Sequence, residues 1–281
     1  MEAFLKFEEY LEKNPPKLES YHPFFEKAVY EPVLSGGKRF RPKLILSVVD
    51  SLNPLLTESA FPVALGVELL HTYSLIHDDL PCMDDANLRR GHPTLHKKYD
   101  ETTAVLAGDG LNTYSFYLIA SAPLAPETKV ELTKELSLAG GLQGMVLGQA
   151  LDCYFENTPL SLDKLEFLHI HKTGRLIAAS LKMGAIIGCG DSKLQKALYD
   201  MGIKLGLMFQ INDDILDVTK STQEIGKDCK NDADKNSYVN LLGLDEALKQ
   251  KQRLKYEIND SLSSFEPKLS ENIQKLISKY L

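Results

Sequence analysis

The segment that most constrains the fold runs from residue 59 to residue 79 and is apolar on nearly every side. A helix of this kind has no face to offer to water, so it belongs in the middle of a bundle of helices. Pro81 should end it, because proline disfavours helix at the residue before it and clashes one turn back. The sequence therefore predicts a central buried helix that ends close to residue 79.

The end of this segment carries four carboxylates within eight residues, namely Asp78, Asp79, Asp84 and Asp85. A carboxylate at a helix C-terminus faces the negative end of the macrodipole, which costs a few tenths to about 1 kcal/mol. The preceding residues offer almost nothing to solvent, so we expect another group to hold these side chains in place; the alternative is a solvated negative end of the helix. A second acidic cluster, on another apolar segment, comprises Asp213, Asp214 and Asp217. The first and last of these are four residues apart and share one helix face.

The other long segments also carry helical patterns, and strand signals are nearly absent. Helices are predicted within residues 2–13, 102–152 (broken at Pro123, Pro126 and Gly140), 163–188, 193–218 and 244–281. The small residues Gly144 and Gly148, four apart, favour close packing of two helices. Residues 219–238 are polar and predict a long loop. Loops of this length are usually functional or disordered. Because no stretch resembles a linker, we expect a single all-α domain over residues 1–281.

Charge and composition exclude several classes of protein. The formal net charge of −7 argues against nucleic acid as the main partner, because such a partner needs a basic face to replace its counterions. No run approaches the roughly 18 apolar residues that would indicate a membrane span. Acidic residues near the N-terminus argue against a signal peptide, so we expect the cytoplasm. The four scattered cysteines fit neither a zinc site nor a disulfide framework.

Two acidic clusters with basic neighbours suggest a particular chemistry. Residues 36–42 form a glycine-opened basic turn, and Arg89 and Arg90 follow the first aspartates. On its own the turn suits a phosphate or a solvated surface equally well. Magnesium prefers oxygen ligands and commonly bridges one or two carboxylates to substrate phosphates. A cation-bridged diphosphate therefore fits the pattern better than zinc chemistry or the two-carboxylate hydrolysis of glycosides.

These motifs, in this order, resemble those of the polyprenyl synthetase family, the trans-isoprenyl diphosphate synthases. The resemblance covers roughly residues 30–245 and rests on the basic turn 36–42, the aspartate motif 78–84 with its two arginines, the triplet 172–174, and Gln210 with the second aspartate cluster. Within the family, the chain looks most like the short-chain bacterial farnesyl type. The resemblance implies an isoprenoid synthase fold, with helices bundled around a large central cavity, and a homodimer.

The resemblance also implies roles for individual residues. Three Mg²⁺ ions would be bound by Asp78, Asp84 and Asp213, with Asp79, Asp214 and Asp217 as additional ligands. The allylic diphosphate would be contacted by Arg89, Lys172, Lys227 and Lys235. The diphosphate of isopentenyl diphosphate would be held by Lys38, Arg41, His71 and Arg90. The backbone carbonyls of Lys172 and Thr173 and the amide of Gln210 would face the reacting cation. Spacing alone places His71 on the same helix face as Asp78, but a buried core histidine satisfies that spacing too.

The reaction implied by the resemblance is that of a farnesyl diphosphate synthase, a transferase. It would condense isopentenyl diphosphate with dimethylallyl and geranyl diphosphates after Mg²⁺-assisted ionisation. The two extra residues Pro81 and Cys82, with Tyr73 and Ser74 before the first aspartate, resemble the pattern that limits the product to C15. Alternatives are a geranylgeranyl diphosphate synthase, which can share the insertion, and a non-catalytic subunit of a heteromeric synthase. A terpene cyclase would lack the second diphosphate site.

Overall fold

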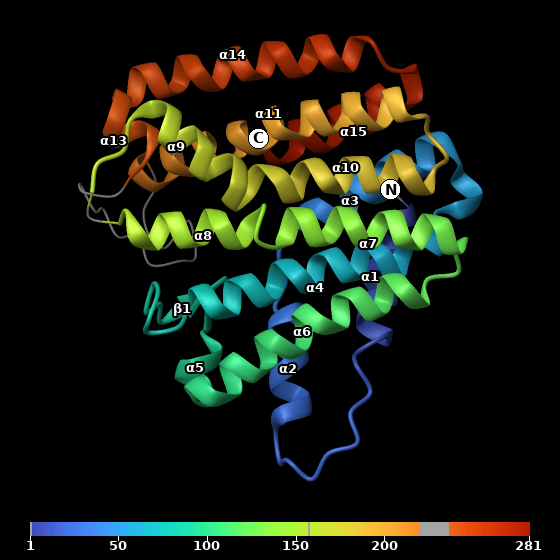
Figure 1. The fold of residues 1–281 in the computed structure, drawn as a ribbon, viewed down its shortest axis with the longest axis vertical. Helices are drawn as coiled ribbons and strands as arrows, with labels where there is room; N and C mark the ends of the chain where they lie inside the picture. The colour runs from blue at the N-terminus through green and yellow to red at the C-terminus, as the bar shows by residue number, and fades with distance from the viewer. Residues whose placement is uncertain (1, 157, 220–235) are drawn as a thin grey trace.

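The computed structural model describes residues 2–156, 158–219 and 236–281 (Figure 1). Every long element in these ranges is a helix. The two strands within them, β1 (Leu88–Arg89) and β2 (His92–Pro93), pair antiparallel as a short hairpin. The expected all-α class is therefore confirmed. Lys227 and Lys235 lie outside the described residues.

The helices follow the patterns predicted from the sequence, with a few extra breaks. In chain order they are α1 (Glu2–Lys13), α2 (Phe25–Leu34), α3 (Phe40–Leu52), α4 (Phe61–Asp78), α5 (Leu95–Lys98), α6 (Glu101–Ser121), α7 (Pro126–Gly140), α8 (Met145–Tyr154), α9 (Leu162–His169), α10 (Arg175–Ile187), α11 (Ser192–Thr219), α13 (Tyr238–Leu242), α14 (Leu244–Ser263) and α15 (Pro267–Tyr280). Two 3₁₀ turns, η1 (Pro54–Leu56) and η2 (Glu58–Ala60), precede α4, and a π-helical turn, η3 (Ile170–Gly174), joins α9 to α10.

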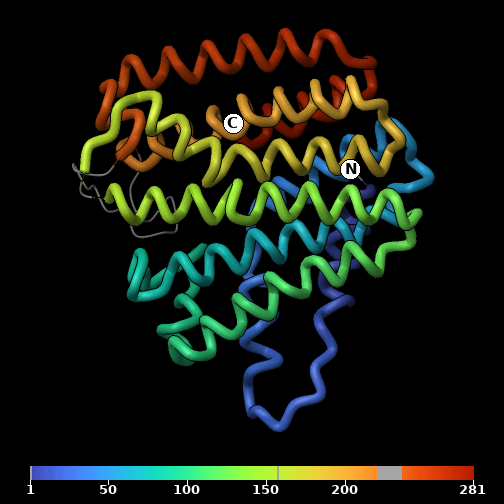
Figure 2. The backbone as a smooth tube through the Cα atoms, viewed as in Figure 1, coloured from blue at the N-terminus to red at the C-terminus, as the bar shows by residue number. Residues whose placement is uncertain are grey.

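The long helices lie roughly side by side, from α14 at the top of the view to α6 in its lower half (Figure 1). Residues 14–24 carry no helix and project below the bundle as a loop (Figure 2). Two clusters of buried apolar side chains form the core, and α3 and α10 contribute to both. Leu46 and Ala179 belong to the first cluster, and Leu44 and Leu181 belong to the second. These two helices therefore join the halves of the bundle.

The central helix α4 is the one predicted from residues 59–79. It packs against α6 and α3, and most of its residues are buried. Its last helical residue is Asp78, so it stops just before Pro81 as expected. The segment Glu58–Asp78 is long and apolar enough to cross a membrane by length and composition, but 72% of its most apolar window is buried inside the protein. Such burial is what a core helix requires.

Glycines let two pairs of helical segments approach closely. A Cβ atom at Gly148 of α8 would lie 2.1 Å from the backbone nitrogen of Lys172 in η3. A Cβ atom at Gly202 of α11 would lie 2.4 Å from the Cα atom of Ala178 in α10. Real Cβ atoms do not approach backbone so closely, so both positions require glycine. The packing role predicted for Gly148 is thus found, and it brings α8 against the turn that carries Lys172.

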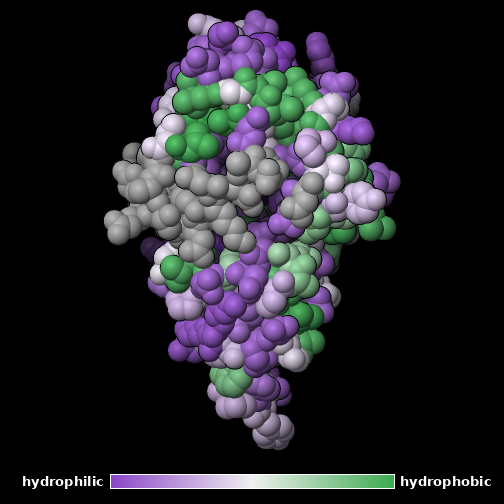
Figure 3. Space-filling view, turned by 90° about the vertical axis from the view of Figure 1, so that its left-hand side faces the viewer, coloured by the Kyte–Doolittle hydropathy of each residue, from purple (hydrophilic) through white to green (hydrophobic). Residues whose placement is uncertain are grey.

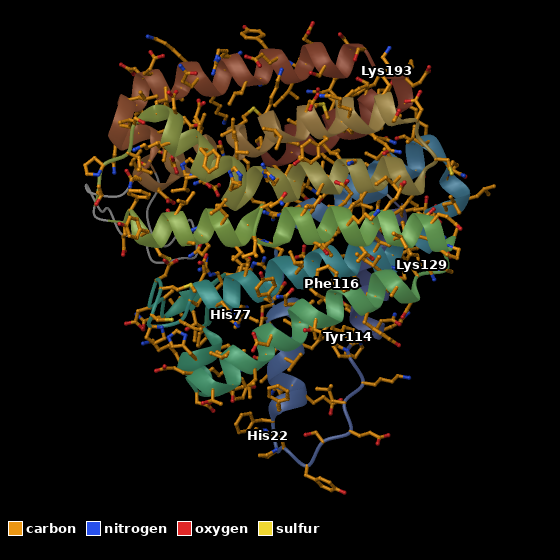
Figure 4. The ribbon with its side chains drawn as sticks, viewed as in Figure 1. His22, His77, Tyr114, Phe116, Lys129 and Lys193 are labelled. Carbon is orange, nitrogen blue, oxygen red and sulfur yellow. The ribbon has the colours of Figure 1, made fainter. Side chains whose placement is uncertain are left out.

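Replacing Gly202 with alanine should destabilise the protein by about 1–3 kcal/mol, because the added methyl group must force α10 and α11 apart. This loss should outweigh the better helix propensity of alanine, which is worth about 1 kcal/mol. Urea unfolding followed by circular dichroism measures the change. The control is Lys193→Ala in the exposed first turn of α11 (Figure 4), which should change stability by no more than about 0.5 kcal/mol. Equal stability of Gly202→Ala and the parent would contradict the close approach.

Candidate active site

A cavity of about 550 Å³ lies where the predicted basic and acidic residues meet. It is bounded by the basic turn before α3, by α4, by the β1–β2 hairpin, by η3 and by α11. The expected site residues that line it are Lys38, Arg41, His71, Arg89, Arg90, Thr173, Gln210, Asp213 and Asp217. Segments almost 180 residues apart in the chain therefore contribute to one cavity. Figure 3 views the molecule from the end at which α4 stops, where hydrophilic residues gather over the lower half of the surface.

The basic side of the cavity holds cations that are short of counterions. Burial lowers the pKa of the Arg41 guanidinium to about 10, against the opposing influence of Glu68. Among the described residues, Nε of Arg41 has no hydrogen-bond partner. The Lys38 ammonium lies 5.1 Å from the centroid of the Phe209 ring, a cation–π contact that holds it at the cavity wall. An anion entering here would find charge and a hydrogen-bond donor already in place.

His71 lies among these cations and is half-buried. Burial lowers its pKa well below the usual value, and the neighbouring Arg41 and Arg90 lower it further. The imidazole is therefore neutral at physiological pH. A neutral ring donates through one nitrogen and accepts through the other, so His71 adds a directional hydrogen bond to the basic side without adding charge.

Arg39 belongs to the same basic turn, but its guanidinium is bound by other protein groups. Its Nη1 donates to Oε1 of Glu68 at 2.9 Å, and both side chains are almost wholly buried. Its backbone is left-handed, with φ of 47°, and Arg90 shares that conformation with φ of 54°. Nη1 of Arg90 donates to the carbonyl of Gly36 at 2.5 Å. Strained residues persist only where their surroundings fix them, and here two of them tie the basic turn to α4 and to the hairpin.

Asp213 and Asp217 of α11 line the acidic side of the cavity, whereas Asp78 ends α4 and does not itself line the cavity. Burial raises the pKa of Asp78 to about 6, although Lys172 opposes that rise. Nζ of Lys172 lies 3.9 Å from Oδ2 of Asp78 and 2.5 Å from Oδ2 of Asp152 on α8. Burial alone would lower the pKa of Lys172, but the two carboxylates outweigh it and raise that pKa to about 12. The lysine therefore keeps its charge between the two carboxylates.

Sequence reasoning missed Asp152. It is a single carboxylate in an otherwise apolar helix, with no acidic neighbour to mark it. The available signal was indirect, because the packing glycine Gly148 lies one turn before it. That glycine presses α8 against η3, and the resulting contact brings Asp152 to Lys172.

Asp79 and Asp214 are engaged by other protein groups. Asp79 is buried, and its Oδ1 accepts hydrogen bonds from Nε and Nη2 of Arg89 at 2.9 and 2.5 Å. It lines a smaller cavity of about 80 Å³ behind this pair rather than the larger one. Oδ1 of Asp214 accepts from Nε2 of Gln210 at 3.0 Å, and Oδ2 accepts from the backbone N–H of Tyr238 at 2.8 Å. Both carboxylates therefore hold neighbouring site residues in position.

The residues expected to face a reacting cation are carried by an irregular element. The sequence predicts a long helical pattern over residues 163–188, and the π turn η3 interrupts that pattern at Ile170–Gly174. Such turns occur often at functional sites because their wider ring of hydrogen bonds changes where carbonyls and side chains point. Within the turn, the hydroxyl of Thr173 donates to Oε1 of Gln210 at 3.3 Å.

The two residues expected to limit chain length lie on α4 before Asp78. Tyr73 is buried in the apolar core, and neither it nor Ser74 lines the 550 Å³ cavity. The hydroxyl of Ser74 donates to the carbonyl of His71 at 2.8 Å. Tyr73 stacks edge-to-face with His77, at 5.7 Å between ring centroids.

The donor set fits magnesium held jointly with a ligand. In the described part of the chain, no three acidic, histidine or cysteine side chains lie close enough to hold an ion by themselves. The expected carboxylates are hard oxygen donors from separate segments: Asp213 and Asp217 on α11 line the cavity, while Asp78 ends α4 and Asp84 follows it. Mg²⁺ commonly takes one or two carboxylates, several waters and substrate phosphates. A phosphate-bridged ion is therefore the form that this arrangement suits.

Comparison with known proteins agrees with this geometry. A family model described as "Polyprenyl synthetase" matches residues 22–277. The farnesyl diphosphate synthase of Micrococcus luteus is 45% identical over 272 residues, which cover 94% of this chain and 92% of that protein. A chloroplastic geranylgeranyl pyrophosphate synthase of Catharanthus roseus is 44% identical over 241 residues, covering 84% of this chain and 67% of that protein.

A solved structure extends the likeness to three dimensions. The geranyltransferase of Helicobacter pylori, complexed with magnesium and isoprenyl diphosphate, has a TM-score of 0.95 and 53% identity, covering 99% of this chain and 95% of that one. The expected isoprenoid synthase fold is thereby confirmed. Fold, motif order and sequence identity lead to one conclusion: the chain belongs to the polyprenyl synthetase family.

Proposed function

We propose that this protein is a short-chain prenyltransferase, a (2E,6E)-farnesyl diphosphate synthase of the dimethylallyltranstransferase type. It condenses isopentenyl diphosphate with dimethylallyl and then geranyl diphosphate to give farnesyl diphosphate. The observation that carries this proposal is the division of one cavity into a cationic side and a carboxylate side. Each side suits one of two diphosphates, whereas a cyclase would need only one. The chain acts as a single domain over residues 1–281.

The cationic side binds isopentenyl diphosphate. Lys38, Arg41 and Arg90 supply charge, and neutral His71 supplies a directional hydrogen bond. The buried Nε of Arg41 has no hydrogen-bond partner among the described residues. A buried donor is costly to leave unpaired, so a bound diphosphate would stabilise this group by accepting its hydrogen bond. Arg39 does not touch the substrate but fixes the turn through Glu68.

The carboxylate side binds the allylic diphosphate. Asp78, Asp84, Asp213 and Asp217 hold Mg²⁺, three ions in all, while Asp79 and Asp214 orient Arg89 and Gln210. When bound, Mg²⁺ neutralises the diphosphate and so makes it a better leaving group. Arg89 and Lys172 stabilise the same charge directly, together with Lys227 and Lys235. The high pKa of Lys172 keeps that residue protonated throughout.

Carbon–carbon bond formation needs no side-chain nucleophile. The bond from C1 to oxygen breaks, and the electron pair leaves with the diphosphate. The backbone carbonyls of Lys172 and Thr173 and the amide of Gln210 face the allylic cation, which the isopentenyl double bond attacks. The departed diphosphate takes the proton lost from the new chain. The turn η3 presents the two backbone carbonyls because its hydrogen bonding departs from that of a regular helix.

Two further expectations concern assembly and location. We propose a homodimer, since α6 and α7 expose large apolar side chains, among them Leu106, Tyr117, Val130 and Leu138. Sedimentation velocity at micromolar concentration measures the oligomeric state directly.

We also propose that the enzyme acts in the cytoplasm, which cell fractionation tests.

Incubation of the purified protein with isopentenyl and dimethylallyl diphosphates should give a C15 diphosphate that forms only with Mg²⁺ present. Mass spectrometry of the products shows whether condensation occurs and how long the product is. Chelation of Mg²⁺ by EDTA should abolish product formation. A C20 product would favour the geranylgeranyl alternative. If no condensation occurs under any metal condition, the chain is better explained as a non-catalytic subunit.

Replacing Asp78 with asparagine should lower kcat by about 10²- to 10³-fold, the usual cost of removing a group that stabilises transition-state charge. The KM for isopentenyl diphosphate should change little, because that substrate binds on the other side of the cavity. Steady-state kinetics with each substrate varied in turn measures both. Asp163→Asn, in the exposed first turn of α9, is the matched control and should behave as the parent does. An equal rise in both KM values at full kcat would contradict this assignment.

Replacing Tyr73 with alanine should lengthen the product, because the removed ring no longer blocks the end of the growing chain. The C20 fraction should rise at the expense of C15 in the mass-spectrometric assay. Tyr256→Ala on α14, where the side chain is 66% exposed, controls for loss of a tyrosine elsewhere. An unchanged product distribution would remove Tyr73 from this role.

A further inference from the structure

His77, the residue just before the first aspartates, is held by both α4 and α6 (Figure 4). Its Nε2 lies 3.1 Å from the backbone oxygen of Val105 on α6. A carbonyl oxygen only accepts hydrogen bonds, so Nε2 carries the hydrogen and donates. Oδ1 of Asp109 lies a further step away, 4.0 Å from the same nitrogen. The imidazole is thus anchored to a neighbouring helix rather than left to solvent.

Gly108 provides the space that the ring occupies. A Cβ atom at this position would lie 2.1 Å from Nε2 of His77 and 2.4 Å from its Cδ2. These separations are far below any allowed contact, so even alanine cannot share this space with the ring. Gly110, two residues further along α6, is different because a Cβ atom there would meet nothing within 4 Å. The chain therefore offers a matched pair of glycines on one helix.

The second partner of His77, besides the carbonyl of Val105, is Tyr73, one helical turn earlier on α4. The two rings meet edge-to-face at 5.7 Å with an interplanar angle of 83°. This geometry is favoured by the ring quadrupoles and adds to the burial of both rings. Tyr73 is only 8% exposed, and His77 is its aromatic contact within the described residues. A residue that α6 holds in place is therefore one of the groups that pack against the tyrosine ring.

We propose that His77, seated over Gly108, is a positioning residue that sets product length by holding Tyr73. This inference rests on the proposed function and on the chain-limiting role of Tyr73. An aromatic ring stops a growing chain only if it keeps its place, since each added isoprene unit pushes against it. Without the imidazole, the tyrosine ring can turn into the vacated space above α6, which makes room for one more five-carbon unit.

The test compares the ratio of C20 to C15 product in the parent with that in three variants, His77→Ala, Gly108→Ala and Gly110→Ala. The first two should each raise the ratio by between about twofold and tenfold, the size of a lost edge-to-face contact converted at 25 °C. Gly110→Ala should match the parent. His77→Gln serves as a milder variant, because its amide can still donate to the Val105 carbonyl while the ring is gone, and it should shift the ratio in the same direction.

A double variant shows whether His77 acts through Tyr73. Groups in contact that act together give non-additive effects. In a Tyr73→Ala background, His77→Ala should therefore leave the product ratio where Tyr73→Ala put it. A further increase, as large as that seen in the parent, would overturn the proposal.

The outcomes also separate this inference from the proposed function. A parent protein that makes no prenyl product would overturn both. If the parent makes C15 and both His77→Ala and His77→Gln give the same C20-to-C15 ratio as the parent, the role of His77 is overturned and the proposed function stands. Because a product ratio is an internal measurement, partial loss of folded enzyme does not alter it.

Discussion

The arrangement depends on one costly placement: a carboxylate at the buried C-terminal end of the apolar helix α4. Burial disfavours the charge of Asp78 there and raises its pKa to about 6. The negative end of the macrodipole also disfavours a carboxylate at this position. Such a group persists because cations are brought to it. Lys172 comes from η3, and Arg89 of the hairpin engages the adjacent Asp79. The positions of two distant segments thus follow from the burial of α4.

Charge is also what gives the cavity two distinct sides. On one side, Arg41 and Arg90 lie close together around a neutral His71, and burial lowers the pKa of both guanidinium groups. Glu68 moderates their repulsion while anchoring Arg39. On the other side, carboxylates predominate and a polyvalent cation can bridge them to a phosphate. Opposite preferences within one cavity let two anionic substrates approach each other, although they would repel in water.

The sequence predicted most of the elements and the location of the site, because both leave local signals. Proline and apolar periodicity marked the end of α4, and clustered aspartates marked the acidic side. What it could not give were pairings across the fold. The inward turn of Arg39 depends on Glu68, 29 residues away, and the role of Asp152 depends on helix packing at Gly148. The π turn escaped notice since its residues favour helix and only the register of hydrogen bonds differs.

The hydrogen-bond register of η3 determines how this segment tolerates the deletion of a residue. A π turn holds one more residue than the α-helical turn it replaces, so deleting one residue from Ile170–Gly174 would let α9 and α10 join as an ordinary helix with its hydrogen bonds intact. The same deletion would leave α9 and α10 in nearly the same relative orientation, because the wider turn already absorbs the extra residue. Backbone continuity would survive, and the alignment of the Lys172 and Thr173 carbonyls would be lost. In this segment, insertion or deletion is thus a sharper threat to chemistry than to folding.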